Sequence, residues 1–294
     1  QHVSEIRIYV PTANDDAVDF LKLFRLYSNT LAVASNIVFD FSQCSFLRQN
    51  AVVFMGGLAR SVQQRGMQVR FDVSTMRDRL KTNLSQNGFL RAFGFGIGPW
   101  AGNSARYRED VVPNADDIVE YISDQWLRDE WVSFSPRLRN AITGRIWEIF
   151  ANAFEHSESE VGVVSCGQLY PRLREMCFTI ADFGIGIPGK VRRFYGDPAL
   201  KDSACLKWAF KRGTTTSRGT VGRGLGLDVL KEFIGLNSGR LEVFSGCGWG
   251  CIQPGGEQYT DLGSGFDGTL VNISLRCDEA YYRFKHEDDE TVVF

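Results

Sequence analysis

The sequence has little of three features that would point to particular classes of protein. It contains only three histidines in 294 residues, its formal net charge is −2, and no apolar run is long enough to cross a bilayer. A nearly balanced charge gives no general affinity for nucleic acid or for membrane surfaces, so we expect neither as a partner. No signal-peptide pattern opens the sequence, and we therefore expect a cytoplasmic protein.

The seven cysteines do not form a recognisable disulfide framework. An odd number of cysteines, spread through a sequence of this length, suits free thiols in a reducing compartment. Cys247 and Cys251 have the spacing of half a metal site, but no second pair with ligand spacing follows, so we interpret them as structural. With 44% hydrophobic and 23% charged residues, the composition indicates a globular protein large enough for two domains.

Residues 1–98 alternate between strand and helix patterns, which predicts a small α/β domain. The predicted strands cover residues 5–10, 36–41 and 68–73, and the predicted helices cover 15–27, 47–65 and 75–93, the last with a break near Gly88. Residues 99–134 read as a connector that contains a helix over 116–126. A second domain is expected over 135–277, followed by a mobile acidic tail over 278–294.

The first motif of the second domain lies on a predicted helix, in which apolar residues recur at helical spacing from position 138 to position 153. Glu148 and Asn152 are four residues apart and therefore project together from another face of this helix. Oxygen ligands suit Mg²⁺, and a nearby carboxylate can activate a nucleophile. The alternative is a solvated helix face with an incidental asparagine.

Two glycine-rich segments follow this helix. A short β-leaning run over residues 177–181 ends at Asp182, and Gly184 and Gly186 come directly after it. A carboxylate at a strand end, beside glycines that let a ligand approach, can accept hydrogen bonds from an amine such as that of adenine. The alternative is a tight turn with a solvated aspartate.

The second glycine-rich segment precedes a predicted helix over residues 227–234. Its glycines are Gly222, Gly224 and Gly226. Glycines that open a helix leave backbone N–H groups free for phosphates. Alone this pattern is a weak signal, because turns also use glycine. The ordered combination of the three motifs is specific, and it predicts one nucleotide site.

Together these motifs resemble those of the GHKL superfamily of Bergerat-fold ATPases, over roughly residues 135–277. Residues 148–156 resemble the N box, and residues 182–186 and 222–227 resemble the two glycine boxes. The resemblance implies ATP and Mg²⁺ as cofactors, with Glu148 as the base, Asn152 as the Mg²⁺ ligand and Asp182 as the reader of the adenine amine. It also implies a nucleotide-contacting set made of His156, Gly184, Gly186, Gly222, Gly224, Leu225, Gly226 and Thr269.

The segment between residues 188 and 222 corresponds to the ATP lid of this superfamily. It carries eight lysines and arginines and only two acids, Asp197 and Asp202. A basic, hydroxyl-rich loop of this kind suits closure over phosphates. The alternative for any single lysine or arginine is an ordinary solvated surface.

The N-terminal pattern resembles the STAS fold of anti-sigma-factor antagonists. In those proteins the loop between the second strand and its helix carries an acidic residue and then the serine that the partner kinase phosphorylates. Arg48, Gln49 and Asn50 stand at that place here. No hydroxyl is available there, so self-phosphorylation at that position is not expected. Ser42 and Ser45 lie nearby and read as ordinary turn serines, and the alternative is that one of them is a shifted phosphoacceptor.

Within the superfamily, a self-contained histidine kinase is disfavoured. Such a kinase needs a phosphoacceptor histidine on a dimerising helix, whereas His2 and His286 lie near the ends of the sequence and His156 belongs to the N box. The length also fits poorly with topoisomerase-like ATPases, which usually carry a further domain. The style is closest to the anti-sigma-factor serine kinases.

We therefore expect an α/β protein in which a STAS-like domain precedes a Bergerat-fold domain with a mixed sheet. The function that this predicts is that of an ATPase or a protein serine/threonine kinase-like regulator in bacterial signalling, acting on a protein partner. The alternative is a nucleotide-gated interaction switch with little turnover, so the sequence leaves open whether the protein is an enzyme. Domains of this superfamily often pair, so a homodimer is an expectation from the resemblance alone.

Overall fold

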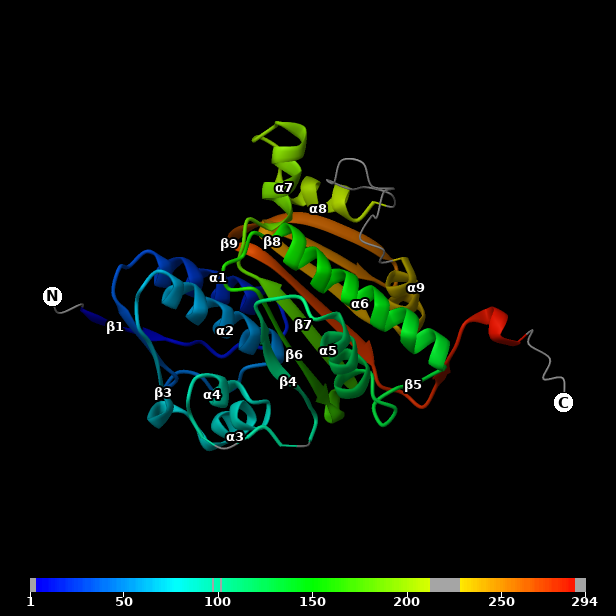
Figure 1. Ribbon diagram of the computed structural model, residues 1–294, viewed down its shortest axis with the longest axis horizontal. Coiled ribbons are helices and arrows are strands. Elements are labelled where there is room, and N and C mark those ends of the chain that lie inside the picture. The colour runs from blue at the N-terminus through cyan, green and yellow to red at the C-terminus, as the bar shows by residue number, and fades with distance from the viewer. Residues whose placement is uncertain (1–3, 97, 101, 212–227, 289–294) are drawn as a thin grey trace.

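A computed structural model describes residues 4–96, 98–100, 102–211 and 228–288. Within these residues the N-terminal part folds as its alternating pattern predicts (Figure 1). Three parallel strands pair in the order β1-β2-β3. The strands are β1 (Glu5–Tyr9), β2 (Asn36–Asp40) and β3 (Val69–Asp72), and the helices between them are α1 (Ala17–Leu31) and α2 (Gln49–Gln64).

Local signals explain where these helices begin and break. α1 begins after Asp16, whose side chain accepts a hydrogen bond of 2.9 Å from the backbone N–H of Asp19, the usual role of an N-cap. The predicted break near Gly88 is confirmed, because this glycine has φ +88 and separates two short helices. These helices are α3 (Asp78–Gln86) and α4 (Phe89–Ala92).

The larger sheet has five strands in the order β4-β6-β7-β9-β8, and every pair is antiparallel. Its strands are β4 (Ser104–Asp110), β6 (Val163–Tyr170), β7 (Glu175–Asp182), β8 (Arg240–Gln253) and β9 (Gly256–Arg276). The mixed α/β class is confirmed, but the mixed sheet expected in the second domain is antiparallel over its described strands. β4 lies within residues 99–134, which the sequence pattern predicted to be a connector.

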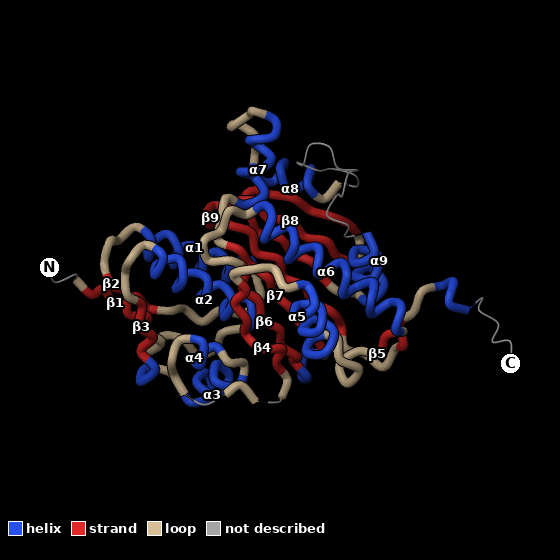
Figure 2. Tube along the Cα trace, viewed as in Figure 1, coloured by secondary structure: helices blue, strands red, loops and turns tan. Residues whose placement is uncertain are grey.

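Helices cover one face of this sheet and stand at one of its ends (Figures 1 and 2). The face is covered by α5 (Ala115–Glu120), the π-helical turn over Tyr121–Trp126, α6 (Pro136–His156) and α9 (Asp228–Asn237). α7 (Gly186–Tyr195) and α8 (Asp202–Ala209) stand at the end of the sheet. The helix predicted over 116–126 is present, and it consists of α5 followed directly by the π-helical turn.

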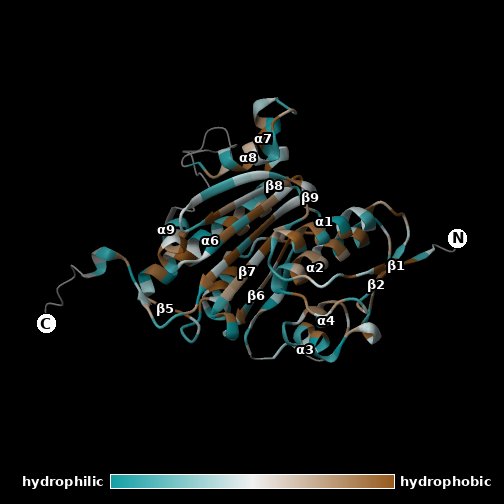
Figure 3. Cartoon of the chain, turned by 180° about the vertical axis from the view of Figure 1, so that it is seen from behind, coloured by the Kyte–Doolittle hydropathy of each residue, from teal (hydrophilic) through white to brown (hydrophobic). Residues whose placement is uncertain are grey.

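The other face of the large sheet is covered by α1 and α2, which lie between the two sheets. Phe20 of α1 stacks on Phe244 of β8 with ring centroids 4.0 Å apart, and Phe24 stacks on Phe266 of β9 at 5.4 Å. Figure 3 shows hydrophobic stretches on these helices and on the strands beside them. One continuous hydrophobic cluster thus contains residues of both sheets.

The C-terminal residues pack against the rest of the molecule over part of their length. β10 (Tyr281–Tyr282) pairs with β5 (Ser133–Phe134), and Ser135 Oγ donates a hydrogen bond of 2.8 Å to Glu287. This packing departs from the mobile tail expected over residues 278–294. Of the helices that the structure describes, none combines the length and the apolar character needed to span a bilayer.

Candidate functional site

Side chains along β7 alternate between the two faces of the large sheet. Phe178 and Ile180 pack in the hydrophobic cluster that contains α6. Thr179, between them, faces α2 and accepts a hydrogen bond of 3.3 Å from the side chain of Gln49. Because a strand has a period of two, Asp182 at its end lies on the α6 face of the sheet.

The Asp182 carboxyl group is buried, with only 4% of the residue exposed. It accepts a hydrogen bond of 3.1 Å from the backbone N–H of Gly184 and another from the backbone N–H of Thr269, its partner on β9. Burial raises the pKa of Asp182 to about 7, although the two hydrogen bonds act in the opposite direction. The site therefore holds a carboxyl group that titrates near neutral pH.

Ser245 on β8 completes this end of the sheet. Its hydroxyl group lies 3.0 Å from that of Thr269 and donates a hydrogen bond of 2.7 Å to the carbonyl oxygen of Gly268. It also accepts a hydrogen bond of 2.9 Å from the backbone N–H of Ile187 in the first turn of α7. One buried hydroxyl thus ties β8, β9 and α7 together beside Asp182.

Close packing explains the two glycines that follow Asp182. A Cβ atom on Gly184 would lie 1.9 Å from the carbonyl oxygen of Ser157, the residue that ends α6. The same oxygen accepts a hydrogen bond of 2.7 Å from the backbone N–H of Ile185. Gly186 has φ +66, a conformation that favours glycine. The loop after β7 is therefore pressed against the C-terminal end of α6.

α6 carries the other candidate residues on the flank of its buried stripe. Glu148 is partly exposed and forms an ion pair of 2.5 Å with Arg145, one turn earlier. Asn152 is partly buried, and its side chain has no hydrogen-bond partner among the described residues. His156 lies in the last turn, with its Nε2 atom 3.8 Å from Glu155. Asn152 and His156 thus lie in the C-terminal part of α6, the end of the helix against which the loop after β7 packs.

The segment expected to be a closing loop is largely helical where the structure describes it. Lys190 and Arg193 of α7 both contact Glu158, at 3.0 and 2.7 Å. Arg192 pairs with Asp202 of α8 at 2.5 Å. These three cations are held by acids of this chain. The remaining predicted residues, Gly222, Gly224, Leu225 and Gly226, lie outside the described residues.

The structure thus brings the first glycine segment, the end of α6 and Thr269 to one end of the large sheet. Carboxyl, carboxamide and hydroxyl groups belong to these segments, beside a backbone kept free of Cβ atoms, and they are groups that can donate and accept hydrogen bonds to a polar ligand. Among models of known protein families, that of the histidine kinase-, DNA gyrase B-, and HSP90-like ATPases matches residues 139–289. The match covers more than half of the sequence, so the chain belongs to this family. A search of curated proteins found no match.

The family match includes all the candidate residues from Glu148 to Thr269 and extends past residue 277, where the second domain was expected to end. An ATP-binding domain of the GHKL type is therefore confirmed. Ser245 was missed, because a serine within a strand carries no motif and becomes notable only through its pairing with Thr269.

Proposed function

We propose that this chain is a cytoplasmic regulator that binds ATP with Mg²⁺ and hydrolyses it or transfers its terminal phosphate to serine or threonine of a protein partner. The observation that carries the proposal is the buried carboxyl group of Asp182, held at a strand end by two backbone N–H groups. Burying a carboxyl group costs stability in its ionised form, and groups whose pKa is shifted in this way are concentrated at functional sites.

Asp182 suits the adenine end of the nucleotide. Its carboxylate can accept a hydrogen bond from the exocyclic amine of adenine, whereas guanine has a carbonyl oxygen at the corresponding position. Two acceptors facing each other in a buried site would be unfavourable. The proposal therefore includes a preference for ATP over GTP.

The residues of α6 suit the phosphate end. The carboxamide oxygen of Asn152 is a ligand type that Mg²⁺ accepts beside waters and phosphate oxygens. Bound Mg²⁺ would supply charge neutralisation at the phosphates. Glu148 lies one turn before Asn152, at the position for a base that takes a proton from water or a hydroxyl group. Its partner Arg145 orients the carboxylate in this structure.

A second candidate function is a nucleotide-gated switch in which turnover is incidental. The ion pair between Glu148 and Arg145 favours it, because the guanidinium group occupies an oxygen of the carboxylate that would otherwise take a proton from the nucleophile. In that case ATP would act by rearranging α7 and α8, whose contacts with Glu158 and the sheet could exchange for contacts with phosphates.

The deciding experiment measures ATP binding and turnover, with Mg²⁺, for the wild type and for Glu148→Ala and Asp182→Asn. Glu155→Ala serves as the matched control, since Glu155 lies on the same helix with an exposed side chain. We expect the wild type and Glu155→Ala to bind and turn over ATP, Glu148→Ala only to bind, and Asp182→Asn to lose binding. Binding without turnover in every binding-competent protein would favour the switch. A wild type that does not bind ATP would refute the proposal.

We further propose that the N-terminal residues form a STAS-like unit that does not accept phosphate at the start of α2. Arg48 and Gln49 are buried there against the large sheet, where Arg48 pairs with Glu175 at 2.6 Å. Mass spectrometry after incubation with ATP should find no phosphate on the exposed Ser42 and Ser45. Light scattering with and without ATP would test the homodimer.

A further inference from the structure

Phe183 lies between two residues of the nucleotide site, yet its side chain points away from that site. The alternation of β7 that places Asp182 on the α6 face sends the next side chain to the opposite face. There the ring of Phe183 packs with Phe54 of α2 at 5.5 Å, Tyr27 of α1 at 6.3 Å and Phe266 of β9 at 5.4 Å. The backbone at Asp182 is therefore attached to the N-terminal helices through its neighbour.

A glycine of α2 makes room for this ring. A Cβ atom on Gly57 would lie 1.8 Å from Cε2 of Phe183 and 2.4 Å from Cδ2. Glycine inside a helix costs about 1 kcal/mol relative to alanine, so its presence in the middle of α2 indicates a need for close approach. Position 57 thus determines how near α2 comes to the loop after β7.

α1 makes a corresponding contact on the neighbouring strand. The hydroxyl group of Tyr27 donates a hydrogen bond of 3.3 Å to Asp267, two residues before Thr269. Burial raises the pKa of Tyr27 to about 12, so this hydroxyl group stays protonated and remains a donor at neutral pH. The N-terminal helices therefore touch the sequence neighbours of both Asp182 and Thr269.

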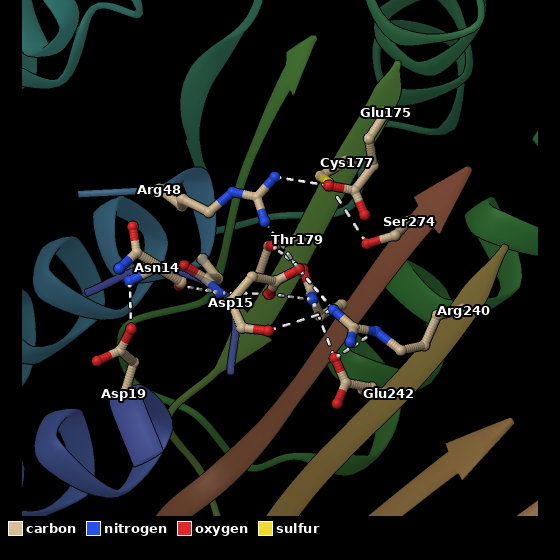
Figure 4. Close-up of polar contacts among 12 residues, drawn as sticks. Asn14, Asp15, Asp19, Arg48, Glu175, Cys177, Thr179, Arg240, Glu242 and Ser274 are labelled. Carbon is tan, nitrogen blue, oxygen red and sulfur yellow. Dashed lines mark hydrogen bonds and ion pairs between the residues drawn. The ribbon is translucent and has the colours of Figure 1, made fainter. Parts of the chain in front are cut away.

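Farther along the same strands, a polar network fixes the N-terminal segments to the sheet (Figure 4). Arg240 of β8 pairs with Asp15 at 2.8 Å, and Arg48 pairs with Glu175 of β7 at 2.6 Å. With these anchors holding α2 to the sheet, we expect extra volume between α2 and the Phe183 ring to displace the ring and the backbone that carries it. The packed interior transmits such strain because it contains few voids.

From these contacts we propose that Phe183 is a positioning residue through which α1 and α2 set the affinity of the nucleotide site, an inference that rests on the proposed ATP binding. A binding partner or modification that moves α2 would then change ATP affinity without touching the nucleotide. The coupling runs from α2 through the Phe183 ring to the backbone that carries the Asp182 carboxylate.

Two adjacent glycines of α2 provide the test. Gly57→Ala forces the Phe183 ring to move, whereas Gly56→Ala forces the ring of Tyr107 on β4, whose hydroxyl oxygen would lie 1.9 Å from the new Cβ atom. Both changes add one methyl group to the same buried helix against an aromatic ring. Dissociation constants for ATP and melting temperatures are measured for both variants and the wild type.

We expect Gly57→Ala to raise the dissociation constant about tenfold, within the usual range for coupling between sites. Gly56→Ala should leave the constant unchanged although its melting temperature changes. The double variant Gly57→Ala with Phe183→Leu should bind ATP more tightly than Gly57→Ala alone, because the smaller side chain makes room for the methyl group. A merely structural role would instead make both glycine variants change the dissociation constant in proportion to their loss of melting temperature.

Equal dissociation constants for Gly56→Ala and Gly57→Ala, or absence of rescue in the double variant, would overturn this inference and leave the proposed ATP binding intact. Failure of the wild type to bind ATP would instead remove the proposed function itself. If Gly57→Ala does not fold, Phe183→Leu alone decides, since it removes part of the ring without a clash. In that variant an unchanged dissociation constant contradicts the positioning role.

Discussion

The buried carboxyl group of Asp182 should make the stability of this protein depend on pH in an unusual direction. Burial raises its pKa from 3.8 to about 7, so between these values the folded chain holds a proton that the unfolded chain has released. The resulting stability is fully present below pH 3.8 and is lost as the pH rises through about 7. At 1.36 kcal/mol for each pKa unit, the whole contribution is about 4 kcal/mol.

Urea unfolding of the wild type and Asp182→Asn, at several pH values from 5 to 8, measures this contribution. Asparagine does not titrate, so the stability of the wild type should fall relative to that of the variant by about 2.5 kcal/mol over this range. The comparison is needed because burial also raises the pKa of Glu242 to about 7. Glu242 therefore also makes the stability of the wild type fall as the pH rises. Glu242 is present in both proteins and cancels in the difference.

Parallel stability curves for the two proteins between pH 5 and pH 8 would refute the reasoning, since they would mean that Asp182 is already ionised in the folded chain at pH 5. The same parallel curves would result if hydrogen bonds to the carboxylate outweighed its burial, because Asp182 would then be ionised in the folded and the unfolded chain throughout this range. The predicted sign also implies a conflict between stability and function. The ionised carboxylate that suits the adenine amine is the form that the empty fold disfavours.

Three further outcomes are expected. Adenosine, which has no phosphate that titrates, should bind about tenfold more weakly at pH 6 than at pH 8 by calorimetry, because the ionised form of Asp182 is the better acceptor. Gly184→Ala should lower stability by about 3 kcal/mol in thermal unfolding because its Cβ would meet a carbonyl oxygen at 1.9 Å, whereas Gly144→Ala, with open space around it, should not. Arg48→Met should cost about 3 kcal/mol in urea unfolding, because it leaves buried Asp15 with one arginine fewer; an unchanged midpoint would contradict this.

Local patterns in the sequence predicted the elements that surround the site well. The strand ending at Asp182 was found because its apolar run stops at a glycine-rich turn, and the helix of Glu148 because its apolar spacing is regular. β8 was not predicted, and three glycines within it, Gly246, Gly248 and Gly250, are of a residue type that is depleted in strands. Its long pairing with β9 overrides that local preference.

The composition of the site beyond its motifs could not be predicted, because it depends on register between strands that are distant in the sequence. Ser245 lies beside Thr269 only because β8 and β9 pair at those positions. In the same way, the contact of Phe183 with Gly57 requires α2 to run along β7 in a particular register, with Gln49 beside Thr179. No spacing within one segment specifies such contacts, so the motifs predict the candidate binding residues and not the residues that pack against them.

β7 carries the candidate site residue Asp182 on one face of the large sheet and packs against the N-terminal helices with its other face. An antiparallel sheet usually has one face in water, and its strands alternate between apolar and polar residues. β7 instead is buried along nearly its whole length, because α6 covers one face and α2 the other. Since Phe244 and Phe266 pack against α1, the hydrophobic core crosses the domain boundary expected near residue 98. Because the second face of the ATP-binding sheet is made of contacts with α1 and α2, a change in those helices reaches the strand ends that carry Asp182 and Thr269.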